Sequence, residues 1–172
     1  TNIGMDFGLF RNRISGSLGY YRKQGKDLFA STMGVPVEGF GYSTYVINNG
    51  QMTNHGLELT LNANILQKND FSWNSSVLYA YNKNKVTYVN VKAPVYFLQL
   101  DYPDAYPRIG NPYQAIYAYK WAGLDQQGIP QVYDENGNKT TQTPTTLESI
   151  VYAGTKVPTH TVSWTNSLSY KN

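Results

Sequence analysis

The chain contains no cysteine, and this absence excludes several chemistries at once. A disulfide framework, a thiolate zinc site and a cysteine nucleophile all require that residue. Histidine is scarce too, because His55 and His160 are the only two among 172 residues. They lie far apart in the sequence and outside metal-ligand spacings such as H-E-x-x-H, so we interpret both as ordinary strand-end residues. We therefore expect no metal site.

Charge of one sign and long apolar runs are also lacking. The 14 Lys+Arg against 11 Asp+Glu leave a net charge of only +3. This charge is too small and too evenly spread to indicate a nucleic-acid partner. No apolar run approaches the roughly 18 residues of a transmembrane helix. Nothing at Thr1 resembles a signal segment, so we expect an internal piece or a mature chain.

Catalytic motifs are missing as well. Gly39-Phe40-Gly41 lacks the third glycine, the strand and the helix of a dinucleotide site, and no G-x-S-x-G elbow is present. A general acid and base would need two convergent carboxylates. Asp101 and Asp104 are close in sequence, but they lie in a loop rich in Tyr and Pro, and we interpret them as solvated loop charges. The sequence predicts neither an enzyme nor a cofactor.

One acidic segment has a second interpretation. Asp134–Asn138 resembles the start of a calcium loop, which needs Gly at its sixth position and Glu at its twelfth. Those positions hold Lys139 and Thr145. Because Asn-Gly is a strong hairpin signal, we predict a turn here.

Aromatic residues are abundant where charge is not. The chain has 16 Tyr and 3 Trp, with 15 Gly and only 15% charged residues, which favours a β-rich surface protein. Its mean hydropathy of −0.47 suits a soluble protein. It does not exclude a membrane protein, because barrel strands present apolar side chains only at every second residue.

Apolar and polar residues alternate in several segments, which indicates strands with one apolar face. These segments are residues 3–9, 13–21, 56–65, 71–82 and 161–170. In the clearest of them, Leu57, Leu59 and Leu61 face away from Glu58 and Thr60. A length of about ten residues is what a tilted strand needs to cross a bilayer.

The connections differ in length on the two sides of these strands. Phe10–Asn12 and Gln67–Asp70 are short turns, whereas 24–53 and 87–158 are long excursions. Outer-membrane barrels have short periplasmic turns and long extracellular loops. The sequence therefore predicts an all-β antiparallel transmembrane barrel segment, with about five membrane strands, long extracellular loops and a larger plugged barrel around it.

A soluble β-sandwich also alternates apolar and polar residues and stays open as an alternative. Two features favour the membrane: the polar faces carry Ser, Thr, Asn and Gly where a soluble surface would carry Lys and Glu, and aromatics lie near strand ends. Phe71, Trp73, Tyr79 and Tyr81 illustrate such an interfacial girdle. An outer-membrane porin without a plug is a second alternative.

Four stretches resemble one family in the correct order. Asn54–Leu59 is similar to the "N-x-G-(I/V/L)-E-L" strand of SusC/RagA-like TonB-dependent outer-membrane transporters. Residues 19–28 resemble its "Y-x-K-x-T-x-D-L" strand, with Gly25 where Thr is usual. Residues 117–137 resemble its "Y-x-Y-x-x-x-G-(L/I)-D … G-x-P … D-x-N-G" loop, and residues 152–172 its "G-(S/T)-x-x-P" strand beginning, without the glycine that often follows the proline.

The resemblance implies a function for a larger protein. The family has an N-terminal plug, a TonB-box and a barrel of about 22 strands, so residues 1–172 resemble a late part of the barrel, with neither plug nor TonB-box. The implied activity is import of oligosaccharides or peptides across the outer membrane of a Gram-negative, Bacteroidota-like cell. The implied partners are a SusD-like surface lipoprotein, outer-membrane lipid, and TonB-ExbB-ExbD acting through the plug.

Tyrosines in the long loops are candidate contacts for substrate or partner, because a flat ring with a polar tip stacks on sugars and peptide groups. They are Tyr42, Tyr45, Tyr96, Tyr102, Tyr106 and Tyr113. The alternative is that they pack the loops together. Glu58, on the lumen face of its strand, is expected to contact the plug.

Overall fold

The computed structural model describes residues 1–33 and 44–171, which divide between two compact units. The first, here called the sheet unit, comprises Thr1–Gln24, Thr53–Asn84 and Pro158–Asn172. The second, here called the loop unit, comprises Gly25–Met52 and Lys85–Val157. Long strands contribute residues to both units.

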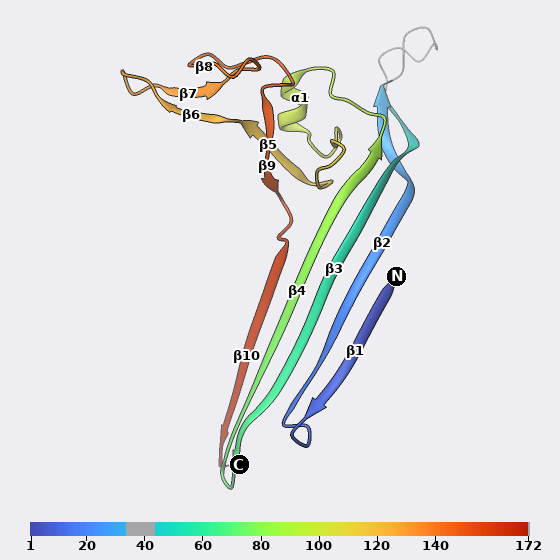
Figure 1. The fold of residues 1–172 in the computed structure, drawn as a ribbon, viewed down its shortest axis with the longest axis vertical. Helices are drawn as coiled ribbons and strands as arrows, with labels where there is room; N and C mark the ends of the chain where they lie inside the picture. The colour runs from blue at the N-terminus through green and yellow to red at the C-terminus, as the bar shows by residue number, and fades with distance from the viewer. Residues whose placement is uncertain (34–43, 172) are drawn as a thin grey trace. The chain divides into compact units, whose positions relative to one another are not determined.

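Five strands form one sheet in the order β1-β2-β3-β4-β10, so β1 and β10 are its edges (Figure 1). They are β1 (Asn2–Leu9), β2 (Ile14–Met33), β3 (Thr44–Lys68), β4 (Phe71–Val89) and β10 (His160–Tyr170). β1 pairs with β2 and β4 pairs with β10, both antiparallel. The five-stranded antiparallel sheet expected from the alternation is confirmed.

One face of the sheet unit is apolar on every strand. Cross-strand partners in an antiparallel pair share a face, and the register pairs Met5 with Leu18 and Val77 with Trp164. In the middle of this face, Ser75 of β4 and Asn166 of β10 are polar, and an indole hydrogen-bonds to each of them. Trp73 Nε1 donates to Asn166 Oδ1 at 3.1 Å, and Trp164 Nε1 donates to the Ser75 hydroxyl at 2.8 Å.

The packing around Gly56 explains why the "N-x-G" motif has a glycine at this position. A Cβ at this position would meet the Tyr81 carbonyl at 2.5 Å and the Tyr21 ring at 2.6 Å. The ring crosses β3 in that space, and the Tyr21 hydroxyl donates to Asn82 Oδ1 at 3.0 Å. An aromatic side chain over a strand glycine restores packing that the glycine lacks and helps to fix strand register. The contact lies on the polar face, opposite Met5 and Leu18.

The apolar face remains largely exposed. On β10, Trp164 is 70% exposed and Leu168 is 64% exposed. A lipid-facing position in a sheet without its barrel predicts that Leu57, Leu59 and Leu61 are exposed, but they are half-buried. Their strand is central, so side chains of β2 and β4 shield them from both sides.

The excursion expected over residues 24–53 needs correction. β2 continues to Met33 and β3 begins at Thr44, so all of its described part is strand. Asp27 has a φ of 53°, a left-handed conformation that interrupts regular pleating. The residues before it, Arg22–Lys26, hold no apolar side chain, so the alternation ends before the strand does. Residues 34–43 lie outside the description.

The loop unit has short elements and a small core. It contains α1 (Tyr96–Asp101) and the pair β5 (Ala115–Tyr119) with β9 (Ile150–Thr155). A further sheet joins β6 (Trp121–Leu124), β7 (Pro130–Tyr133) and β8 (Lys139–Thr140). The core consists of Ala115, Tyr117 and Ile150, with Tyr96, Leu100 and Tyr119 packed against it. Among the helices of the described residues, none is long and apolar enough to span a membrane.

Candidate functional site

A cavity of about 590 Å³ lies within the loop unit. Its walls are mostly apolar, with a few polar groups among them. They are formed by Leu28, Phe29, Val46, Gly50, Gln51, Met52, Val86, Tyr88, Val89, Asp104, Ala105, Pro107 and Tyr113. This size and character are typical of small-ligand sites, in which a few polar groups orient a ligand between apolar walls.

Asp104 offers this cavity a hydrogen-bond acceptor. Its Oδ2 lies 3.0 Å from Lys156 Nζ in an ion pair whose side chains are 40% and 45% exposed, so the pair adds little stability. Its Oδ1 is buried and has no hydrogen-bond partner among the described residues. That oxygen is shielded from solvent, so a ligand in the cavity would meet Asp104 through Oδ2, which lies in the exposed ion pair. Our interpretation of Asp104 as a solvated charge is therefore right for Oδ2 and wrong for Oδ1, while Asp101 is exposed at the end of α1.

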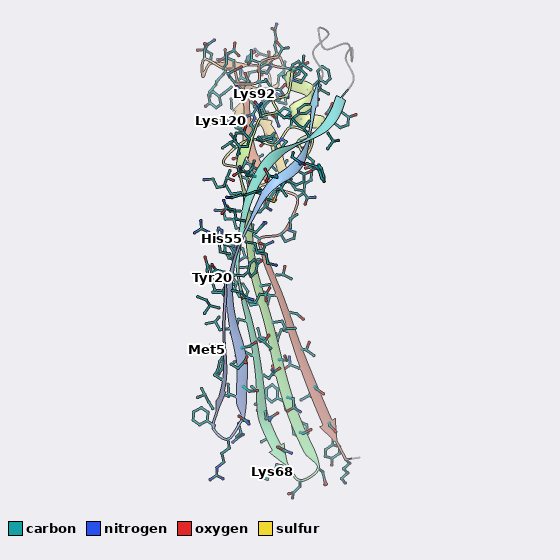
Figure 2. The ribbon with its side chains drawn as sticks, turned by 90° about the vertical axis from the view of Figure 1, so that its right-hand side faces the viewer. Met5, Tyr20, His55, Lys68, Lys92 and Lys120 are labelled. Atoms are coloured by element: carbon teal, nitrogen blue, oxygen red, sulfur yellow. The ribbon has the colours of Figure 1, made fainter. Side chains whose placement is uncertain are left out.

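A second cavity of about 410 Å³ shares Val89 and Pro107 with the first. Its lining is more highly charged and includes Lys92, Arg108 and Glu148. Lys92 is labelled in Figure 2, and its side chain is exposed. The loop unit therefore offers two adjoining cavities of different polarity.

Arg108 holds together the segments around the second cavity. Its Nη1 and Nη2 donate to the carbonyls of Ile150 and Leu147 at 2.9 and 3.0 Å. Its Nε donates to Gln99 Oε1 at 3.1 Å, and its guanidinium carbon lies 4.9 Å from the centre of the Tyr117 ring. A planar fork with several donors suits such a junction better than an ammonium group does.

Two of the six predicted contact tyrosines are half-buried in the loop unit. Tyr96 packs against the core, so for this ring the alternative of loop packing is favoured. Tyr106 lines the second cavity, and its carbonyl accepts from Gln99 Nε2 at 3.0 Å, so its role in binding stays a prediction. Tyr42 and the side chain of Tyr45 lie outside the described residues.

Tyr102 and Tyr113 have the exposure that a contact residue needs. They are 60% and 40% exposed, and Tyr113 lines the first cavity. Their role in binding stays a prediction. Sequence reasoning missed Tyr88 and Asp104 as cavity residues, because the cavity combines the continued strands β2, β3 and β4 with residues 104–113.

Asp134 forms the turn that the sequence predicts. Its Oδ1 accepts from the backbone N–H groups of Asn136 and Asn138 at 3.0 and 2.7 Å, and Gly137 has a φ of 81°. The backbone hydrogen bond from Asn138 is the main cause that lowers the pKa of Asp134. The pKa of Glu135 is also lowered, by its own backbone N–H and by the Thr146 and Ser149 hydroxyls.

This turn is expected to loosen in acid. Because the folded pKa values of Asp134 and Glu135 lie below their ordinary values of 3.8 and 4.5, their stabilisation is complete above those values and disappears as pH falls through the folded pKa values. Hydrogen exchange of the Asn136–Asn138 amides, corrected for intrinsic rates, should therefore accelerate below about pH 4. Asp134→Asn should remove most of that dependence. If Asp134→Asn were as sensitive to acid as the wild type, the role assigned to the Asp134 carboxylate would be contradicted.

An open antiparallel sheet with one exposed apolar face and one polar face is typical of the wall of a β-barrel membrane protein. The model of the family "TonB dependent receptor-like, beta-barrel" matches residues 1–171, and the chain belongs to this family. The TonB-dependent receptor SusC of Bacteroides thetaiotaomicron is 30% identical over 139 residues, which cover 79% of this chain and 13% of SusC. The TonB-dependent receptor P3 of Formosa agariphila is 27% identical over 196 residues, covering 99% of this chain and 19% of P3.

Solved structures agree with this family. The RagAB peptide transporter matches with a TM-score of 0.75 and 25% identity, over 99% of this chain and 19% of that one. The RagAB peptide importer in its open-open state gives a TM-score of 0.79 at 23% identity, which shows the fold. The SusC/RagA-like resemblance predicted from the motifs is thus confirmed. The chain spans less than a fifth of the length of these relatives.

Proposed function

We propose that residues 1–172 are a partial barrel domain of an outer-membrane transporter that actively imports oligosaccharides or peptides. The observation that carries this proposal is the sheet unit, whose continuous apolar face is exposed while its other face is polar, in a chain of the TonB-dependent receptor family. The sheet supplies part of the barrel wall. The protein is a transporter and not an enzyme.

The first cavity is the proposed contribution of this chain to substrate binding. Apolar walls with the Asp104 carboxylate and the Tyr88 and Tyr113 rings suit both candidate substrates. Peptides present N–H groups and side chains, and sugars present hydroxyls and ring faces. The name of the RagAB peptide transporter supports a peptide.

The proposed partners follow from the same family. A SusD-like surface lipoprotein cooperates in import, and TonB-ExbB-ExbD supplies energy through a plug that contacts Glu58. Glu58 is exposed on the polar face of β3, where such a contact needs it. Outer-membrane lipid contacts the opposite face, in a Gram-negative, Bacteroidota-like cell.

Uptake by cells with the full-length protein tests the function. Labelled peptides and oligosaccharides should enter wild-type cells, and a protonophore should abolish uptake of the true substrate class. Asp104→Asn should reduce that uptake, whereas Asp101→Asn, on an exposed residue outside the cavity wall, should not. Uptake that resists the protonophore would support a porin. Absence of the protein from the outer membrane would support a soluble sandwich.

The sidedness of the strands gives a further prediction for the full-length protein. Gln67→Cys, beside the short turn between β3 and β4, should resist an impermeant thiol reagent on intact cells. Asn136→Cys, in the exposed turn between β7 and β8, should react rapidly. After cell lysis both variants should react. Labelling of Gln67→Cys from outside would reverse the proposed topology.

A further inference from the structure

The two histidines of the chain each lie beside Tyr81 on the apolar face of the sheet unit. The His55 ring lies 6.2 Å from the Tyr81 ring, and the Tyr81 ring lies 5.0 Å from the His160 ring. The Tyr79 hydroxyl is 2.9 Å from His160 Nδ1. Polar-tipped rings from three strands therefore gather at one place on a face that is otherwise apolar.

This cluster lies at one end of the apolar face. The register of β4 and β10 pairs Phe71 with Tyr170 at one end and Tyr81 with His160 at the other. Strands that rise about 3.3 Å per residue and tilt by about 40° cover roughly 25 Å of membrane between those pairs, which is the height of a barrel's apolar band. The cluster is thus at headgroup level, at the end away from the Asn69–Asp70 turn.

Two permanent cations extend the same face just beyond the aromatic rings. Side chains alternate along a strand, so Lys83 shares a face with Tyr81 and Arg22 shares a face with Tyr20. Tyr20 is on the apolar face, because its cross-strand partner is Ile3. Lys83 and Arg22 are both exposed. Figure 2 labels Tyr20 and His55 along one side of the sheet.

The pairing of β2 with β3 brings Arg22 beside the histidines. Asn64 N–H donates to the Arg13 carbonyl at 2.8 Å, and counting equally along the two strands from that pair places Arg22 opposite His55. Neighbouring strands are about 4.8 Å apart, so Arg22 and Lys83, one on each side of β3, are within reach of a single headgroup.

Acidic side chains are absent from this face in the described part of the sheet unit. Asp6 is paired with Ser17 on the polar face, and Glu58 lies on the polar face of β3. Asp70 lies in the short turn at the other end. Within the described sheet unit, the cations beyond the rings therefore share their face with no carboxylate.

We propose that Arg22, His55, Lys83 and His160 bind the phosphate group of a membrane lipid at the outer rim of the barrel. This rests on the proposed function, because the apolar face must lie in the membrane. Arginine binds phosphate oxygens through two parallel N–H donors, and lysine binds them as a point charge. The tyrosine and histidine rings supply the amphipathic surroundings found at membrane interfaces. Long basic side chains extend from the apolar band towards the headgroups.

Native mass spectrometry of the full-length protein in detergent tests this site. The probes are lipid A with its phosphates and the same lipid without them. Wild type should retain the phosphorylated form preferentially. Arg22→Gln should lower that retention about fivefold, and adding Lys83→Gln should lower it about fivefold again. The matched control is Lys23→Gln, which removes one charge next to Arg22 on the opposite face, where Lys23 Nζ lies 5.3 Å from the Tyr21 ring centre.

Two results would overturn the proposal: equal retention of both lipid forms, or equal losses in Arg22→Gln and Lys23→Gln. The same variants are checked for folding by thermal unfolding. If one unfolds early, His160→Gln replaces it and should also reduce retention. Uptake and outer-membrane location of the wild type are measured in parallel. Failure of lipid binding with uptake intact refutes the lipid site alone, whereas absence from the outer membrane refutes the proposed function too.

Discussion

Leu61→Arg in the full-length protein is expected to lower the free energy of unfolding by about 2–4 kcal/mol, the cost of a charged side chain near the middle of the lipid face of a barrel. Leu61 lies on the apolar face of the central strand β3, away from both ends of that face. The guanidinium cannot reach water or headgroups from there as easily as Arg22 can. Denaturant unfolding in lipid vesicles measures the difference.

Asn62→Arg is the matched control for this change. Asn62 is the next residue along β3, so it points to the polar face, where its Oδ1 accepts from the Ser76 hydroxyl at 2.8 Å. Losing that bond costs about 1 kcal/mol, and the added charge remains in water. The order of the two effects is the critical result. Equal costs, or a larger cost for Asn62→Arg, would mean that the apolar face does not meet lipid.

The sheet unit could be predicted from sequence because the alternation of apolar and polar residues that marks its strands is a local pattern. Each strand carries its own alternation, as Leu57, Leu59 and Leu61 show, and short turns make consecutive strands neighbours. The pattern fails along Arg22–Lys26, which hold no apolar side chain and so give no sign that β2 continues. It also cannot give degree of burial, which depends on whether a strand is central or at an edge.

The loop unit was much less predictable, because its contacts join distant residues. Lys156 and Asp104 form an ion pair, and Arg108 bonds to Leu147 and Ile150, across gaps that no local pattern encodes. Composition suggested that tyrosines there bind ligands, but rings such as Tyr96 serve the core instead. The resemblance to a family suggested the function, whereas the cavity could be recognised only from the structure.

Arg108→Met should open the loop unit more than any other single change there. The substitution keeps the apolar stem but leaves the carbonyls of Leu147 and Ile150 without their donors, and Gln99, only 2% exposed, without the donor to its Oε1. Hydrogen bonds from a charged donor contribute about 1.5–3 kcal/mol each, and the stacking on Tyr117 adds less. After allowing for relaxation and water, a loss of about 3 kcal/mol is expected.

Hydrogen exchange of the full-length protein in detergent measures this loss locally. Amides of residues 147–150 should exchange about a hundredfold faster in Arg108→Met, since about 1.4 kcal/mol changes an opening constant tenfold. The sheet unit should keep its protection, because none of the lost bonds involves it. Arg108→Lys retains the charge but not the fork, so it should recover only a minor part of the protection. The control is Lys92→Met, which removes an exposed charge from the same cavity and should leave exchange unchanged. Full recovery in Arg108→Lys would show that charge, and not the geometry of the guanidinium, holds these segments together.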